Sequence, residues 1–371
     1  MSVSENPGAR GKKTAVRVGA VGLGVAVLIG GIVFFTRMTG PSGPEVPSSN
    51  PDVVETTPAP EARGVIDVDG DGIIRVGFSQ VGAESGWRTA NTQSFQDYFV
   101  EANGFELVFI DANEKADKQT ADVRELISLG VEVIVIAPVS ATGWAPVLEE
   151  AQAARIPVIN ADRKFDCPED LYLFFFGGNM EQQGINAVNW LTKNVTTVKG
   201  LGLTMEDVKI AHLQGMLGST AQMGRSKALA DAIDSGNGWT IVYQSTGEYN
   251  KEKGIIAFES MFAVDGGRNF NVIWGENDDM VYGALDALSD AGLSADGYVI
   301  VSFDGNCSAV QMVKEGIIDV IAECTPLFAD QIGELIKRVD AGETVGKVQY
   351  TVEGFIDATN IDAKLPVCFG S

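Results

Sequence analysis

Short runs of consecutive apolar residues alternate along this chain with longer segments of mixed polarity. The runs of the first group fall at about 73–79, 105–110, 133–137, 156–160 and 171–176, and those of the second at about 208–213, 240–245, 271–274, 298–303 and 319–322. Short apolar runs are typical of strands buried on both faces, and the amphipathic segments between them are typical of helices. The alternation predicts an α/β protein with parallel sheets covered on both faces. Two groups of strands predict two doubly wound lobes.

The pattern before residue 73 is different. Four basic residues between Arg10 and Arg17 precede an uninterrupted apolar run at 18–35. As a helix this run would be about 27 Å long, close to the thickness of a bilayer core, and the basic flank places residues 1–17 in the cytoplasm. Neither an A-x-A site nor a cysteine follows, so we expect an uncleaved signal anchor, with a cleaved signal peptide as the alternative. Residues 36–72 are rich in Pro and Ser and predict a tether.

Composition narrows the classes of function. The 371 residues carry 27 basic and 50 acidic side chains, a formal charge of −23, which argues against a nucleic-acid partner. His212 is the only histidine, and its apolar surroundings predict a plain strand residue. Because the chain has a single histidine, a metal site with two histidine ligands is excluded. We expect no metal, no cofactor and no catalytic residue.

The cysteines leave two interpretations open. Cys167, Cys307, Cys324 and Cys368 are too far apart for a CxxC redox or zinc motif. In an exported chain they could form two disulfides in any of three pairings, or remain buried free thiols.

An acidic segment has the spacing of a calcium-binding loop. Asp67, Asp69 and Asp71 follow the D-x-D-x-D-G pattern, but Phe78 stands where the twelfth position requires a bidentate glutamate. We favour an acidic turn over a calcium site.

Polar side chains gather where the predicted strands end. Such residues follow successive strands at 80–88, 111–113, 138–144, 162–163, 214–225, 276–279, 304–306 and 323–326. Ligands of open parallel sheets bind at the carboxyl ends of the strands. Carboxylates, amides and guanidinium groups suit sugar hydroxyls, and an indole suits the apolar face of a sugar ring. The competing explanation is that Asp and Asn merely cap the next helix.

Several of these segments resemble the periplasmic sugar-binding proteins of ABC importers, in the ribose-binding branch with the type I fold. The resemblance rests on residues 76–88, 136–144, 156–163, 277–280 and 303–305, and extends from about residue 73 to about residue 357. The Ser-Gly-Trp-Arg at 85–88 and the Ala-Thr-Gly-Trp at 141–144 resemble the galactofuranose-binding members in particular.

The resemblance implies an architecture. The chain would cross between lobes three times, near 176–178, 324–326 and 352–355. The first lobe would then comprise residues 73–176 and 325–352, and the second residues 177–324 and 353–371.

The resemblance also implies a function and a site. The protein would be a non-enzymatic, monomeric receptor in the cell envelope, outside the cytoplasm, anchored by its N-terminal helix or secreted if that helix is cleaved. It would close on one monosaccharide, galactofuranose or another furanose or pentose-like sugar, and dock on an ABC permease. The residues implied to bind the sugar are Glu84, Trp87, Arg88, Asp162, Arg163, Arg225, Asn277, Asp304 and Glu323.

Three other functions compete with this one. A sugar sensor beside a receptor kinase would use the same domain and anchor. A transcriptional repressor core is disfavoured because no helix-turn-helix precedes residue 73. A glycosidase acting through Asp162, Asp278 or Asp279 is disfavoured because Arg163 should keep Asp162 ionised, which makes it a poor general acid.

Overall fold

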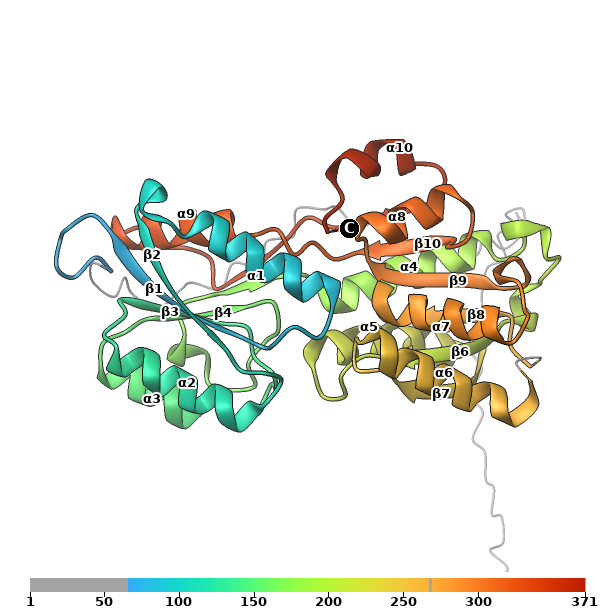
Figure 1. Ribbon diagram of the computed structural model, residues 1–371, viewed down its shortest axis with the longest axis horizontal. Helices are drawn as coiled ribbons and strands as arrows, with labels where there is room; N and C mark the ends of the chain where they lie inside the picture. The colour runs from blue at the N-terminus through green and yellow to red at the C-terminus, as the bar shows by residue number, and fades with distance from the viewer. Residues whose placement is uncertain (1–65, 267–268, 371) are drawn as a thin grey trace, which may run out of the picture. The chain divides into compact units, whose positions relative to one another are not determined.

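The computed structural model describes residues 66–266 and 269–370, which contain two six-stranded sheets (Figure 1). The predicted cytoplasmic segment, the apolar run at 18–35 and most of the tether lie outside the described residues. In the described part, no helix is long and apolar enough to cross a membrane. The anchor therefore stays a prediction.

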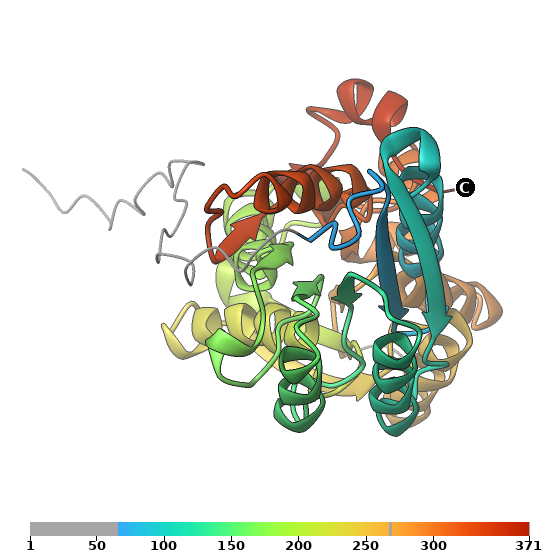
Figure 2. The same ribbon diagram turned by 90° about the vertical axis from the view of Figure 1, so that its left-hand side faces the viewer.

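The first sheet has the strand order β11-β5-β4-β3-β1-β2, and all its strands are parallel. The strands are β1 (Ile74–Gln80), β2 (Phe105–Asp111), β3 (Val133–Ile136), β4 (Val158–Ala161), β5 (Phe175–Gly177) and β11 (Val348–Tyr350). The helices of this lobe are α1 (Gly86–Tyr98), α2 (Ala116–Ser128), α3 (Ala145–Ala153) and α9 (Ala329–Asp340). Helices α1 and α9 pack on one face of the sheet, and α2 and α3 on the other (Figure 2).

Alternation along the strands produces these two faces. In β3, Val133 and Val135 join the core under α1 and α9, whereas Ile134 and Ile136 join the core under α2 and α3. Successive side chains of a strand point to opposite faces, so a continuous apolar run supplies both cores.

The second sheet has the order β12-β10-β9-β8-β6-β7. Its strands are β6 (Lys209–Gln214), β7 (Thr240–Thr246), β8 (Val272–Gly275), β9 (Val299–Asp304), β10 (Val320–Glu323) and β12 (Phe355–Ile356). Its helices are α4 (Met180–Asn194), α5 (Thr220–Asp234), α6 (Lys251–Asp265), α7 (Asp278–Asp290), α8 (Cys307–Lys314) and α10 (Ile361–Lys364). Helices α4 and α5 cover one face, and α6, α7 and α8 the other. The fold class is confirmed, with one departure: β12 pairs antiparallel with β10 at the edge of the sheet.

Short 3-10 turns complete the connections. They lie at Glu101–Asn103, Glu169–Leu171, Val198–Gly200, Met205–Asp207, Ala295–Gly297 and Leu365–Val367. Helix α1 ends at Tyr98, because the chain leaves helical geometry at Phe99. One of the 3-10 turns shortens a predicted element. The strand expected at 171–176 is regular only from Phe175, although Leu173 already donates a backbone bond to β4.

Three segments connect the two sheets. Strand β5 of the first sheet leads through 178–179 to α4, β10 of the second sheet leads through 324–328 to α9, and β11 leads through 351–354 to β12. We call these three crossings the hinge. The resemblance places the crossings near 176–178, 324–326 and 352–355, and the connecting segments of the structure overlap those ranges.

One disulfide forms among the four cysteines. It joins Cys307, the first residue of α8, to Cys368 near the C-terminus, while Cys167 and Cys324 are free thiols. The disulfide holds the C-terminal segment against the second lobe, where the Cys307 amide also donates to the Phe369 carbonyl. Phe369 itself packs into the core beneath α1 and α9 of the first lobe.

Candidate functional site

Eight of the nine residues implied to bind a ligand surround one small cavity between the lobes. The first lobe contributes Glu84, Trp87, Arg88, Asp162 and Arg163, and the second contributes Arg225, Asn277 and Asp304. The cavity has a volume of about 30 Å³. The carboxyl ends of both sheets face it, as the strand-end rule predicts.

Glu323 is the residue that does not line this cavity. Its carboxylate accepts hydrogen bonds from Lys364 Nζ at 2.6 Å and from the Gly354 amide at 3.0 Å. The next residue, Cys324, lines the cavity instead. Neighbouring residues of an extended chain point to opposite sides, so a position one residue away faces the other way.

A buried ion cluster forms the first-lobe wall. Glu84 Oε1 accepts from Arg88 Nε at 3.0 Å and from Arg163 Nη2 at 2.9 Å. Arg88 Nη2 donates to Asp162 Oδ2 at 2.6 Å, and Arg88 Nη1 donates to Gln80 Oε1 at 3.1 Å. Burial raises the pKa of Glu84, but the attraction of Arg88 and Arg163 outweighs burial and leaves this pKa below its ordinary value. Glu84 is therefore ionised at neutral pH.

Two atoms of this cluster lack a hydrogen-bond partner within the described part of the chain. Glu84 Oε2 and Arg163 Nε are both buried, and both residues line the cavity. Arg163 Nε lies 3.7 Å from Asp162 Oδ2, within ion-pair distance but without a hydrogen bond. Buried polar atoms in native proteins nearly always have hydrogen-bond partners, so an acceptor and a donor without hydrogen bonds at one cavity indicate a ligand that both donates and accepts. A hydroxyl group does both.

Arg225 forms the centre of the second-lobe wall. Its Nη2 donates to Asp304 Oδ1 at 3.0 Å, and its guanidinium also donates to the carbonyl of Glu276. Gln183 Oε1 accepts from Arg225 Nε at 3.0 Å and from Nη2 at 2.8 Å. Burial raises the pKa of Asp304 to about 6, with Arg225 opposing the shift. The two lobes thus each present an arginine held by a carboxylate.

Two cavity aspartates have unusual backbone conformations. Asp162 has φ +61° and Asp304 has φ +97°, both in the left-handed region that residues with a Cβ rarely adopt. Gly177 lies so close to Asp162 that a Cβ there would come within 2.9 Å of the Asp162 Cα. Strain of this kind concentrates at functional sites, where the surrounding structure maintains it.

Some cavity residues also have structural partners. Asn277 caps α7 by accepting from the Met280 amide at 2.9 Å, as the competing explanation for strand-end Asn predicts. The Trp87 indole N–H donates to the Cys324 carbonyl at 2.8 Å. These bonds orient the side chains that face the cavity.

The carboxylates considered for a glycosidase are placed differently. Asp278 does not line the cavity. It accepts from Ser302 Oγ at 2.6 Å and from two backbone amides, and burial together with Asp304 raises its pKa. Asp279 accepts from the Gly86 amide of the other lobe at 3.0 Å. Both carboxylates therefore hold backbone in place.

Several cavity residues were not found from the sequence. Tyr249, Met180, Ala221, Ser85 and Cys324 also line the cavity. The Tyr249 ring lies beneath the Arg163 guanidinium, 5.4 Å from its carbon to the ring centroid. Tyr249 follows β7, and reading that strand end as well would have identified it.

Two sequence features lie away from the cavity. Trp144, part of the Ala-Thr-Gly-Trp segment, is buried in the core of the first lobe, where its ring lies 5.0 Å from that of Phe165. His212 is a strand residue of β6 as predicted, but its Nε2 lies 2.9 Å from Glu276 Oε1, a buried partner that the sequence did not reveal.

Contacts between the lobes flank the cavity. The Lys164 amide donates to Thr220 Oγ1 at 3.1 Å, and Lys253 Nζ lies 4.0 Å from Glu114. With the bond between Gly86 and Asp279, these contacts bring the two lobes together in this structure.

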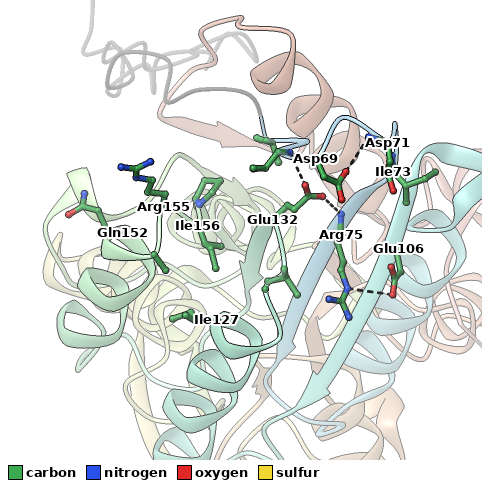
Figure 3. A pocket seen from close by; sticks show the side chains of 16 residues that line it. Asp69, Asp71, Ile73, Arg75, Glu106, Ile127, Glu132, Gln152, Arg155 and Ile156 are labelled. Atoms are coloured by element: carbon green, nitrogen blue, oxygen red, sulfur yellow. Dashed lines mark hydrogen bonds and ion pairs between the residues drawn. The ribbon is translucent and has the colours of Figure 1, made fainter.

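The acidic segment borders a second, larger groove of about 910 Å³ (Figure 3). Asp67, Asp69 and Asp71 have carboxylate oxygens within 4.8 Å of one another. Each also accepts from backbone amides of its own loop, which is the geometry expected for an acidic turn. Glu132, which also lines this groove, accepts from the Arg75 amide at 2.9 Å (Figure 3).

Comparison with known proteins places both lobes in one family. Residues 76–343 match the periplasmic binding protein domain. The galactofuranose-binding protein YtfQ of Escherichia coli (strain K12) is 34% identical over 268 residues, which cover 71% of this chain and 81% of that protein.

Two solved structures are similar over a comparable range. One is the periplasmic binding component of an arabinose ABC transporter from Shewanella sp. ANA-3, bound to α- and β-L-arabinofuranose, with a TM-score of 0.73 and 31% identity over 79% of this chain and 94% of that chain. The other is a protein from Mycobacterium smegmatis in complex with β-D-fucofuranose, with a TM-score of 0.73 and 34% identity over the same shares.

Proposed function

The chain belongs to the periplasmic binding protein family, and from this premise we propose that it is the extracytoplasmic sugar-binding receptor of an ABC importer. Its ligand is one monosaccharide in furanose form, with galactofuranose the first candidate. The sugars in the names of the relatives support this choice, since galactofuranose, arabinofuranose and fucofuranose are all furanoses.

The unpaired polar atoms at the cavity carry this proposal. Glu84 Oε2 offers an acceptor and Arg163 Nε a donor, and Trp87 lines the same cavity. A sugar supplies hydroxyls for the two polar atoms and an apolar C–H face for the ring.

Closure of the two lobes on the ligand is the proposed mechanism. A ligand favours the closed form only if it contacts that form better than the open one, which requires contacts to both lobes. Arg163 from the first lobe and Arg225 from the second supply them. The hinge crossings absorb the change in backbone angles.

The proposal includes the absence of catalysis. A glycosidase needs one carboxyl group that donates a proton and a second that activates water or attacks the sugar. Glu84 and Asp162 are instead bonded to Arg88, and Asp304 to Arg225. These carboxylates hold arginines in place, which suits binding without reaction.

We also propose a place and a partner. The receptor acts as a monomer outside the cytoplasm, tethered by the apolar run at 18–35 or released if that segment is cleaved. Its closed form delivers the sugar to an ABC permease.

A thermal-shift panel tests the proposed function. Full-length protein is heated with galactose, arabinose, fucose and ribose solutions, which contain furanose forms, and with amino acids as the control. A sugar present at a hundred times its Kd should stabilise the protein by about 2.7 kcal/mol. Stabilisation by amino acids with no response to any sugar would refute the proposal.

A further inference from the structure

Glu353 lies in the third hinge crossing, bonds the second and lies close to the first. Its Oε1 accepts from Thr351 Oγ1 at 2.7 Å and from the Thr325 amide of the second crossing at 3.1 Å. A Cβ at Gly178, in the first crossing, would lie 3.0 Å from Glu353 Oε2. One partly buried carboxylate therefore lies within contact range of all three segments that connect the lobes.

The same carboxylate is joined to the cavity through Gln183 of α4. Gln183 Nε2 donates to Glu353 Oε2 at 2.7 Å, while Gln183 Oε1 accepts two bonds from Arg225. Gln183 is 1% exposed and does not line the cavity. It thus lies between the hinge and a residue of the site.

The direction of these bonds is fixed by chemistry. A guanidinium only donates, so the Gln183 oxygen must face Arg225 and its NH2 group must face Glu353. Glu353 Oε2 must then accept. A proton on Oε2 would point at the Gln183 N–H, and the hydrogen bond between the two residues would be lost. Turning the Gln183 amide around would direct its NH2 group at the Arg225 guanidinium, which is also a donor, and the bonds to Arg225 would be lost instead.

We infer that Gln183 and Glu353 are positioning residues that couple the hinge to Arg225, so that the placement of Arg225 for the ligand depends on an ionised Glu353. This inference rests on the proposed function. Neither residue touches the ligand, and both act through Arg225.

The surroundings of Glu353 place its titration in an accessible pH range. Burial raises its pKa to about 7, against the hydrogen bonds from Thr351, Gln183 and Thr325 and the charge of Arg225. Two titratable groups from elements packed against it interact with Glu353: Arg225 from α5, and the buried Cys324 thiol from the second crossing. The first crossing and the contacting face of α4 present the neutral Gly178 and Gln183.

Calorimetric titration of the wild type and four variants with the sugar selected by the thermal-shift panel tests the inference. Gln183→Met removes both links and should weaken binding roughly tenfold, the value of one bond to a charged group. Gln182→Met is the matched control, since the neighbouring Gln182 bonds only Asn186 through its side chain, and it should bind like the wild type. Glu353→Gln should weaken binding less than Gln183→Met. The double variant Gln183→Met/Glu353→Gln should bind the sugar no more weakly than Gln183→Met alone, because both residues affect the ligand through Arg225.

The pH profile separates positioning from a merely structural role. A bound ligand that fixes Arg225 favours ionised Glu353, so wild-type affinity should strengthen as the pH rises from 5.5 to 8. Asp304 titrates in the wild type and in Glu353→Gln alike. The difference between their two pH slopes therefore measures the contribution of Glu353.

The outcomes are distinct. Wild-type affinity in Gln183→Met, additive losses in the double variant, or identical pH slopes in wild type and Glu353→Gln would each overturn the inference alone. No binding of any sugar by the wild type would overturn the proposed function and the inference with it.

Discussion

Arg163 and Arg225 approach the cavity from opposite lobes, each 4% exposed or less. Each guanidinium is bonded to a carboxylate, Arg163 to Glu84 and Arg225 to Asp304. Because the planar fork of donors fixes both the carboxylate and the ligand, we expect these two residues to contribute most to affinity.

Replacing either arginine by alanine should weaken sugar binding roughly tenfold to a hundredfold, because a hydrogen bond to a charged group is worth about 1.5–3 kcal/mol. Arg163→Lys should bind only slightly better than Arg163→Ala, since an ammonium cannot reproduce the fork. Calorimetry measures both. Wild-type affinity in the two alanine variants would mean that the site lies elsewhere.

Glu353 should also make stability depend on pH. Its pKa is raised from 4.5 to about 7, so the folded protein holds this proton more tightly than the unfolded chain does. The resulting stability is fully present below pH 4.5 and is lost as the pH rises through 7, a change of about 3 kcal/mol. Urea unfolding at several pH values should show this loss in the wild type and not in Glu353→Gln. Parallel profiles for the two proteins would contradict the assignment.

The residue types of the site could be predicted because the carboxyl ends of parallel strands converge. Eight of the nine residues follow that rule and meet at one cavity. Glu323 does not, because the direction of a side chain at the end of β10 depends on a single residue of register. Gln183 and Glu353 could not be found this way, since their roles depend on how the three crossings pack together.

At the scale of elements, most strands and helices could be predicted from apolar periodicity. The exceptions are local. The expected strand at 171–176 begins with a 3-10 turn, and β12 pairs antiparallel with β10 through only two residues. A pairing of two residues is too short to show the apolar periodicity by which a strand is predicted from sequence. The cysteines form one disulfide and leave two free thiols, which is neither of the two interpretations left open by the sequence. The proximity of Cys307 and Cys368 follows from the path of the chain after the third crossing.

The disulfide should contribute substantially to stability. It joins residues 61 positions apart, and a cross-link closing a loop of that length restricts the unfolded chain by about 4 kcal/mol in the chain-entropy model. The variant Cys307→Ser/Cys368→Ser should lose about 2–4 kcal/mol of unfolding free energy, measured by denaturant titration. Cys167→Ser, at a free thiol, is the control. Equal losses in both proteins would show that the cross-link is not the cause.

At the scale of the whole molecule, the account requires hinge motion. Contacts such as that between Lys164 and Thr220 join the lobes in this structure, and the three crossings are the segments that would bend. Small-angle X-ray scattering of the full chain should show a smaller radius of gyration with the selected sugar than without it. An unchanged radius at saturating sugar would contradict ligand-driven closure.

Calorimetric titration of the wild type and of Arg163→Ala/Arg225→Ala with the selected sugar tests the central claim most directly. The claim is that one monosaccharide binds between the lobes, held by an arginine from each. The account predicts one sugar per chain for the wild type and no measurable binding for the double variant. Unchanged binding by the double variant, or no binding of any monosaccharide by the wild type, would contradict it.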